Sequence, residues 1–460
     1  MKFGRFGSSK ARCGMIPAIA IMGLAMLFAP TVAAEPVALT GVRLIDGIGA
    51  KPIEDATVVI DKGRIVSAGP APKRLPYGTT VRDYRGRIVM PGLISDHSHV
   101  GQVRGVTSGT PNYTRENIVA ALRAYEAKGV TTVMALGLNG AIFPSIRAEA
   151  HAGRLPGADV FGVDRGIGVP DGAPPQSMLK VGPDQLFRPS TPEQAREAIR
   201  AMKARGGDMA KLWLDDFGGS VPVKMKPEIY KAAINEAHTQ GLRVAAHVHD
   251  LEDARAIVLA GADVVAHGVR DKPVDAAFVQ LLKSSGTWYI PTLALDEATF
   301  IYADRPAWTR TPFVRDALSP ELTARFDDPA WRSKTLADPK TAAARKSLAI
   351  NLRNLKTLYD AGVKIGFGTD SGAAPERIPG VAEHRELVLM VEAGLTPLQA
   401  IGVATANAAA LLKLDDRGTL TTGRLADLVV LSSDPSESIE DSVTIIETWH
   451  RGISSTSVER

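Results

Sequence analysis

The chain has 460 residues, of which 45% are hydrophobic and 23% are charged, and it contains 43 glycines. This composition is typical of a globular protein and excludes a fibrous or mainly disordered chain. The length fits two or three average domains, or one large barrel with a smaller domain. The formal net charge of +4 arises within the first 34 residues, which hold four basic residues and no acidic one, so the rest of the chain is balanced. We therefore expect neither nucleic acid nor an anionic membrane surface as the main partner.

Residues 1–34 have the pattern of an export signal. A basic stretch ends at Arg12, an apolar run covers residues 15–28, and small residues lead to Ala34. This predicts cleavage after Ala34, a periplasmic or secreted protein, and no stable membrane span after processing. An uncleaved anchor is the alternative, although the apolar run is short for a span. The single cysteine, Cys13, precedes that run, so the processed chain would have no thiol ligand, thiol nucleophile or disulfide.

The remaining chain divides into two kinds of sequence. Short alternating apolar and polar stretches fill residues 35–90 and return in residues 418–460, which indicates β-strands. Residues 91–417 repeat a helix-period segment that ends at a glycine and precedes an apolar strand. Eight such strands are expected, over residues 93–99, 130–136, 159–163, 209–214, 243–249, 263–267, 288–293 and 364–369.

This alternation predicts an α/β protein with a (β/α)8 TIM barrel and a small β-sandwich domain built from both ends of the chain. An open, doubly wound sheet is the alternative, but no glycine-rich phosphate loop follows the first strand. Two connections, residues 166–190 and 296–344, are long, and long loops in compact domains are often lids or binding loops. The aromatic residues of the second connection also suit a small satellite core.

Histidines gather where a barrel would have its active site. His97, His99, His247 and His267 fall at the C-terminal ends of expected strands, which is the end where barrel active sites are built. Residues i and i+2 of a strand point the same way, so His97 and His99 can both face the barrel axis. Asp370 follows the last expected strand, which lies beside the first once the barrel closes. Such convergence predicts a metal centre, and imidazole and carboxylate ligands suit zinc.

Lys211 lies within an expected apolar strand, where an unpaired ammonium group is costly to bury. Two explanations are open. The amine forms an ion pair with Asp215 or Asp216, or it has reacted with carbon dioxide to give a carbamate that can bridge two cations.

The segments GRIVMPGLISDHSHV, AKLW, AAHVH, VVAHG, GTDSG and GRLADLVVL together resemble the motifs of the amidohydrolase superfamily, over nearly the whole processed chain. The likeness is to its binuclear, metal-dependent amidases and dipeptidases, the imidazolonepropionase-like and prolidase-like branch. It implies two divalent ions, commonly zinc, with a hydroxide and carboxylated Lys211 between them. His97, His99 and Asp370 would bind one ion, and His247 and His267 the other. Asp370 would take a proton from the attacking water and pass it to the leaving amine.

Four residues are candidates for contact with the substrate. His249 shares the strand face of His247, where a hydrogen bond to another site residue is equally expected. His384, just beyond the last expected strand, is a candidate substrate or lid contact, with a solvated helix position as the alternative. Arg165 and Arg377 are candidates for pairing with a substrate carboxylate, because a guanidinium group donates in a fork.

The sequence thus predicts an exported hydrolase that cleaves a C–N bond of a small amide or peptide-like substrate by a metal-bridging hydroxide. The same site would serve a lactone or other ester. A one-metal deaminase is a further alternative, because residues 249–252 have its His-x-x-Glu spacing, but such a site needs no bridging Lys211. A binding protein that retains metal without turnover fits the complete ligand set less well. The exact substrate and the formation of a homo-oligomer stay open.

Overall fold

The computed structural model describes residues 1, 35–175, 180–217 and 219–455. Apart from Met1, the predicted export signal lies outside these residues, so its cleavage stays a prediction. Within the described ranges, no helix combines the length and the hydropathy that a membrane span requires.

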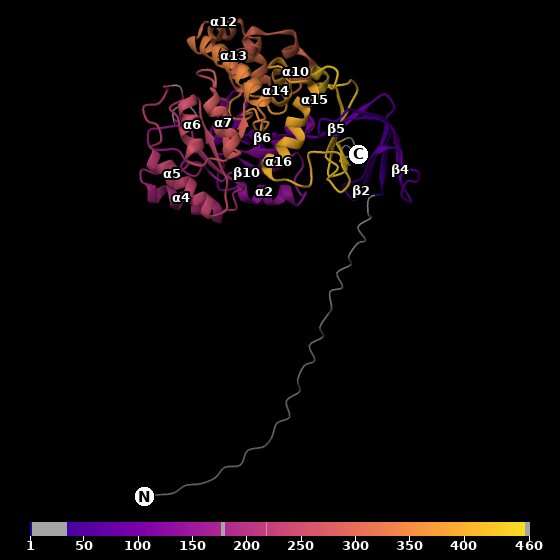
Figure 1. Cartoon of the computed structure of the whole chain (residues 1–460), viewed down its shortest axis with the longest axis horizontal. Coiled ribbons are helices and arrows are strands. Elements are labelled where there is room, and N and C mark those ends of the chain that lie inside the picture. Colours follow the sequence, from indigo (N-terminus) through magenta and orange to yellow (C-terminus); the bar gives the residue numbers. More distant parts are fainter. Residues whose placement is uncertain (2–34, 176–179, 218, 456–460) are drawn as a thin grey trace. The chain divides into compact units, whose positions relative to one another are not determined.

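Strands from both ends of the described chain form one eight-stranded sheet (Figure 1). They are β1 (Val37–Leu44), β2 (Ile53–Asp61), β3 (Arg64–Pro70), β4 (Thr80–Asp83), β5 (Ile88–Pro91), β15 (Leu428–Leu431), β16 (Ile445–His450) and β17 (Ile453–Ser454). The order is β17-β16-β15-β5-β1-β2-β3, and β4 also pairs with β1. β5 and β15 run antiparallel, with Met90 opposite Val429. The two strand-rich regions therefore share a sheet, as their sequences predicted, whereas a two-layered β-sandwich stays a prediction.

Seven parallel strands form two further sheets. One has the order β10-β9-β6, and the other the order β11-β12-β13-β14. Their bounds are β6 (Leu93–Ser98), β9 (Val130–Ala135), β10 (Asp159–Gly162), β11 (Ala210–Trp213), β12 (Val244–His247), β13 (Val264–Ala266) and β14 (Trp288–Ile290). Nearly every residue of these strands is buried, as expected for parallel strands that are covered on both faces.

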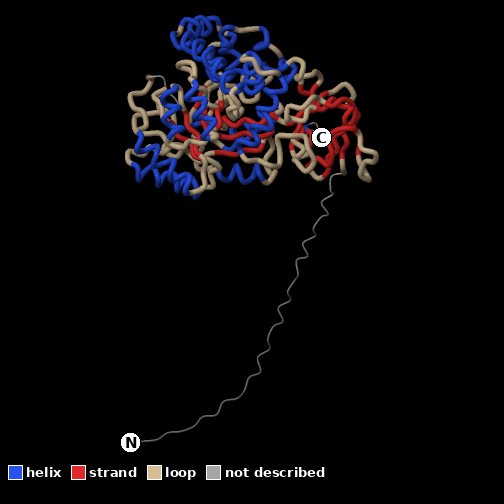
Figure 2. Tube along the Cα trace, viewed as in Figure 1, coloured by secondary structure: helices blue, strands red, loops and turns tan. Residues whose placement is uncertain are grey.

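Helices cover these parallel strands, whereas the sheet from the chain ends lies in a region that is mostly strand and loop (Figure 2). The helices that follow the strands are α1 (Arg115–Ala127), α2 (Phe143–His151), α4 (Pro192–Ala204), α5 (Pro227–Thr239), α6 (Leu251–Leu259), α7 (Ala276–Ser285), α13 (Pro339–Asp360), α14 (Val381–Glu392), α15 (Pro397–Gly402) and α16 (Ala408–Leu412). Gly286 follows the last residue of α7 and has a φ of 69°. The glycine after each helix-period segment led us to expect such a helix end.

The eighth expected strand, residues 364–369, is not a regular strand. Single parallel bridges join Ile365 to Tyr289 of β14 and Ser371 to Ser98 of β6. The Asp96 carboxylate accepts the Phe367 N–H at 3.0 Å, so that donor is not available to a regular ladder. Backbone hydrogen bonds nevertheless link this segment to β14 and β6, because the Lys364 carbonyl accepts from Tyr289 N–H and the Phe367 carbonyl accepts from Asp96 N–H. Closure into one eight-stranded barrel therefore stays a prediction.

The second long connection folds into short helices. These are α8 (Leu293–Glu297), α9 (Ile301–Asp304), α10 (Pro312–Arg315), α11 (Pro320–Asp327) and α12 (Pro329–Ala337). Tyr302 stacks on Phe326 with ring centroids 4.2 Å apart, and Trp308 and Trp331 pack against the same cluster. The expected satellite core is thus confirmed, and a lid function stays a prediction.

A buried ionic group joins β10 to the C-terminal region. Asp159 Oδ2 lies 2.9 Å from both Arg417 Nη1 and Arg451 Nη2, and the Asp159 and Arg417 side chains are only 1% and 5% exposed. We expect Asp159→Ala to lower the free energy of unfolding by about 3 kcal/mol, because it removes a buried carboxylate that is shared by two guanidinium groups. Arg417 would keep its contacts with Asp416. Urea denaturation measures this loss. Glu193→Ala, which removes an exposed ion pair with Arg196, is the control and should cost less than about 1 kcal/mol.

Candidate metal centre

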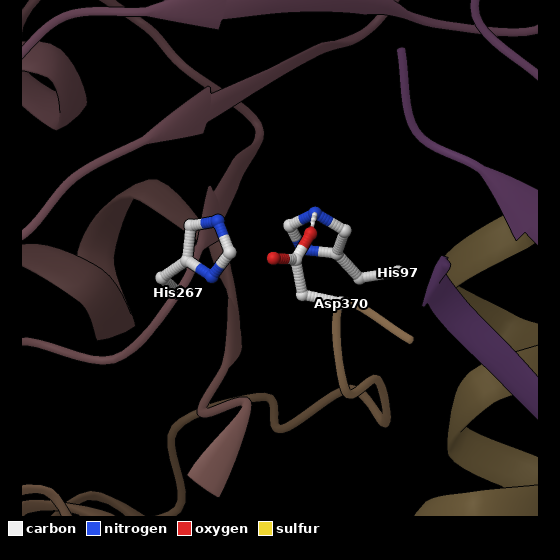
Figure 3. A group of neighbouring side chains, drawn as sticks. All are labelled: His97, His267 and Asp370. Carbon is white, nitrogen blue, oxygen red and sulfur yellow. Dashed lines mark ion pairs between the residues drawn. The ribbon is translucent and has the colours of Figure 1, made fainter. Parts of the chain in front are cut away.

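A cluster of histidines and one aspartate lies at the C-terminal ends of the parallel strands. His97 and His247 belong to the ends of β6 and β12, and His267 follows β13. Figure 3 shows the side chains of His97, His267 and Asp370 pointing toward one another. One ligand atom from each of these three residues lies within 4.8 Å of the other two, and all three residues are buried.

The other two predicted histidines join this group. Asp370 Oδ1 lies 3.0 Å from His99 Nε2 and 3.2 Å from His97 Nε2. The His267 ring centroid lies 4.4 Å from that of His97 and 4.3 Å from that of His247. Five side chains from four separate segments of the chain thus converge, as their positions at strand ends predicted.

Lys211 stands on β11 beneath this cluster, and its side chain is 1% exposed. Its Nζ lies 3.5 Å from His97 Nε2. Among the described residues, no carboxylate oxygen lies within 4.0 Å of Nζ, because Asp215 faces His247 and Asp216 faces Lys224 instead. The ion pairs that would have explained a buried lysine are therefore absent from the described part of the chain. Burial lowers the pKa of Lys211 to about 7.

The ionisation of the cluster suits metal ligands. Burial lowers the pKa of His97 to about 3, and it also holds the pKa values of His247 and His267 well below the usual range. Burial therefore favours the neutral form of these three imidazoles, which is the form that binds a metal. Burial alone would raise the pKa of Asp370, but the Arg377 guanidinium and hydrogen bonds from His97 and His99 hold that pKa well below its usual range.

Hydrogen bonds from outside the cluster orient two of its imidazoles. His99 Nδ1 faces the Gly137 carbonyl at 3.2 Å, and His267 Nδ1 faces Thr292 Oγ1 at 3.0 Å. Such partners fix the ring of a metal-binding imidazole, and they turn His99 Nε2 toward Asp370. The buried His97 Nδ1 has no partner among the described residues. This donor set of imidazoles and a carboxylate fits a divalent metal.

The backbone at the cluster is strained. His267, Thr292 and Asp370 have positive φ values of 135°, 47° and 58°, in a region that costs a residue with a side chain about 1–3 kcal/mol. Gly368 allows a close approach, because a Cβ there would lie 2.6 Å from His97 Cβ. Strain of this kind is common at functional sites, and the sequence carries no local signal for it.

The cluster opens into a cavity of about 230 Å³. Sequence reasoning placed His249 and Arg377 there, and both line it. It missed Arg270, which follows His267 by three residues, and Asp296 of α8. The position of Arg270 just after a strand-end histidine was an available signal, whereas Asp296 lay in a connection of unknown shape. The apolar part of the wall is formed by Leu138, Trp213, Phe217, Leu295 and Ala373.

The structure does not place the other two substrate candidates in this cavity. Arg165 lies over the Phe187 ring, 4.6 Å from its centroid, and its Nε lies 3.7 Å from Asp164 Oδ2. His384 is buried on α14, where Nδ1 contacts Ser442 Oγ at 2.9 Å and Nε2 contacts the Lys128 carbonyl at 2.8 Å. His384 has both ring nitrogens engaged in structural hydrogen bonds and borders a separate cavity.

His384 should make stability depend on pH. Burial lowers its pKa to about 4, so between about pH 6.5 and 4 the unfolded chain binds a proton that the folded chain does not. The free energy of unfolding therefore falls as the pH falls through this window, and His384 accounts for about 3 kcal/mol of that fall. We expect His384→Gln to lose this dependence, as measured by urea denaturation at pH 7 and pH 4. The exposed His238, replaced by glutamine, is the control, and equal pH dependence in wild type and His384→Gln would contradict the prediction.

Known proteins resemble this chain in sequence and fold. The model of the amidohydrolase family matches residues 88–453. Ochratoxinase of Aspergillus niger is 26% identical over 453 residues, which cover 89% of this chain and 84% of that protein. Imidazolonepropionase of Deinococcus radiodurans is 24% identical over 404 residues, covering 83% of this chain and 86% of that protein.

Solved structures match in fold. The crystal structure of A. niger ochratoxinase has a TM-score of 0.71 at 23% identity and covers 91% of this chain and 95% of its own. A Xaa-Pro dipeptidase with bound methionine in the active site also has a TM-score of 0.71, at 24% identity, with 91% and 99% covered. Since the family model spans well over half of the sequence, the chain belongs to the amidohydrolase family of metal-dependent hydrolases.

Proposed function

We propose that the protein is an exported hydrolase that uses two divalent metal ions, zinc being our expectation, to cleave an amide or peptide-like C–N bond of a small substrate. The observation that carries this proposal is the convergence of four imidazoles and Asp370 around a buried lysine at the ends of the parallel strands. The match to the amidohydrolase family and the Xaa-Pro dipeptidase among the similar structures support the bond class.

The ligands divide into two sets. His97, His99 and Asp370 would hold one ion, and His247 and His267 the other. Lys211, carboxylated on Nζ, would supply a carbamate to both. Its Nζ lies 3.5 Å from His97 Nε2, with no carboxylate oxygen of the described residues within 4.0 Å, and this position supports that role. Two divalent ions bound there would polarise the scissile carbonyl and lower the pKa of water.

Asp370 is proposed to move the proton. Arg377 contacts Asp370 Oδ2, while Oδ1 faces the imidazoles of His97 and His99. The guanidinium thus keeps the carboxylate ionised and fixes its orientation. In that position Asp370 would accept a proton from the attacking water and donate it to the leaving amine.

We also propose that the two parallel sheets and residues 364–371 together form the (β/α)8 barrel, with the sheet from the chain ends as its companion domain. The bridges Tyr289–Ile365 and Ser98–Ser371 support closure on one side, and the bridge Ile167–Leu212 supports it between the third and fourth strands. This arrangement explains why side chains from distant segments meet at one end of the strands.

The one-metal deaminase is less well supported. Its His-x-x-Glu spacing would place Glu252 in the site, but the Glu252 side chain is 67% exposed and pairs with Lys272. A lactone or ester hydrolase remains the second candidate, because the proposed metal centre would polarise any activated carbonyl.

A substrate screen tests the bond class. The zinc-loaded protein is assayed with N-acyl amino acids, dipeptides, aryl amides and lactones. Turnover of amides or peptides above that of lactones supports the proposal, and exclusive lactone or ester turnover would replace it with the second candidate.

Export is tested separately. Cleavage after Ala34 predicts that mass spectrometry of the protein recovered outside the cytoplasm finds Glu35 at the N-terminus. An intact Met1 on exported protein would contradict it.

A further inference from the structure

The cavity above the metal centre contains a carboxylate that the proposed chemistry does not use. Of the described residues that line it, Asp370 and Asp296 are the two acids. Asp370 belongs to the metal centre, whereas Asp296 lies on α8, within the connection that follows β14. The Asp296 side chain is only 10% exposed.

Asp296 lacks the hydrogen bonds that a buried carboxylate normally has. Its nearest cation is Arg270, whose Nε lies 3.6 Å from Asp296 Oδ1, beyond hydrogen-bond distance. Arg270 Nη1 is held by the Val248 and Gly268 carbonyls at 3.3 Å and 3.0 Å. Oδ2 has no partner among the described residues. Burying a carboxylate with so few donors is costly. A cation bound in the cavity beside the carboxylate would therefore offset part of this cost, whereas the buried Oδ2 itself is not accessible.

We infer that Asp296 binds the protonated amino group of the substrate, so that the enzyme acts on amides or peptides whose acyl side carries a free amine. This inference rests on the proposed function and names its substrate class. Leu295 and Phe217 line the same cavity, and they would pack against an apolar side chain next to that amine.

The charges in the cavity favour an amine at Asp296 over a carboxylate. Arg270 and Arg377 also line the cavity, and the proposed metal ions add positive charge. An ammonium group entering such a site needs a negative partner, and Asp296 is the one acid among the described lining residues outside the metal centre. A substrate carboxylate would instead be repelled by Asp296 and attracted to the arginines.

The test compares two substrates that differ only in the amine. We expect the zinc-loaded wild type to hydrolyse L-leucine anilide about 10- to 100-fold more efficiently, in kcat/KM, than N-acetyl-L-leucine anilide, the size of effect that a charged hydrogen bond has. Asp296→Asn should reduce this ratio to near one while kcat/KM for the acetylated substrate stays close to wild type. Glu376→Gln, which removes an acid from an adjoining cavity that shares Arg377, should keep the wild-type ratio.

Two results would overturn the inference: no preference in the wild type, or an equal loss on both substrates in Asp296→Asn, which would mean that Asp296 only supports Arg270. If Asp296→Asn fails to fold, or if the wild type hydrolyses neither anilide, a binding measurement on the wild type provides the test. Calorimetric titration of the wild type with L-leucinol and N-acetyl-L-leucinol should show tighter binding of the free amine. Equal binding of the two overturns the inference. Preferential binding without turnover of any amide supports it and counts against the proposed reaction alone.

Discussion

Lys211→Ala is expected to lose bound metal and activity together, with turnover falling by roughly 1000-fold or more, because the lost carbamate would be a ligand of both ions. The buried amine lies 3.5 Å from His97 Nε2 and has no carboxylate partner among the described residues. Its removal therefore breaks no ion pair of 4.0 Å or less among the described residues, and the main expected loss is the proposed bridge. Metal content by mass spectrometry and turnover of an amide substrate measure the two losses.

Short carboxylic acids or bicarbonate at high concentration should restore part of the activity of Lys211→Ala, since they supply a replacement bridge. Lys224→Ala, which removes a surface ion pair with Asp253, is the matched control and should keep metal and rate. If Lys211→Ala retained two metals per chain and near-normal turnover, the carbamate mechanism would be wrong. The one-metal alternative would then have to be reconsidered.

Asp370→Asn should separate catalysis from metal binding. The amide keeps the shape of the side chain but cannot take a proton from water, so we expect turnover to fall about 100- to 10 000-fold, the range typical for loss of a general base. At least one metal should remain, because the four histidines and Lys211 are unchanged. Metal content and kcat are the measurements.

Asp304→Asn, at a surface ion pair with Arg345, is the control for this substitution and should leave kcat unchanged. Near-normal kcat in Asp370→Asn with full metal content would show that another group moves the proton. Complete loss of both ions would instead show that Asp370 acts mainly as a ligand.

The chain's periodic patterns determined much of this protein. Alternating residues predicted the strands that join both chain ends, and buried apolar runs predicted seven of the parallel strands. The histidines could be assigned to one site because parallel strands place their C-terminal ends together, so position along the chain translates directly into position in space. Lys211 was recognisable because a charge in an apolar strand conflicts with its surroundings.

Other features were decided by the tertiary structure alone. The regular strand expected over residues 364–369 is interrupted, because the Asp96 carboxylate accepts the backbone N–H of Phe367. His384 and Arg377 both follow the last strand segment. His384 lies on α14 and is buried against Ser442, whereas Arg377 precedes that helix and lines the cavity.

The polar residues of the cavity wall also could not be predicted from the sequence. Asp296 reaches the cavity because the connection after β14 folds into α8, a path that no local period encodes. Hydrophobic periodicity reports only which face of an element is buried. Which polar side chains from loops share a cavity depends on how those loops pack, and that is set by contacts between residues distant in the sequence.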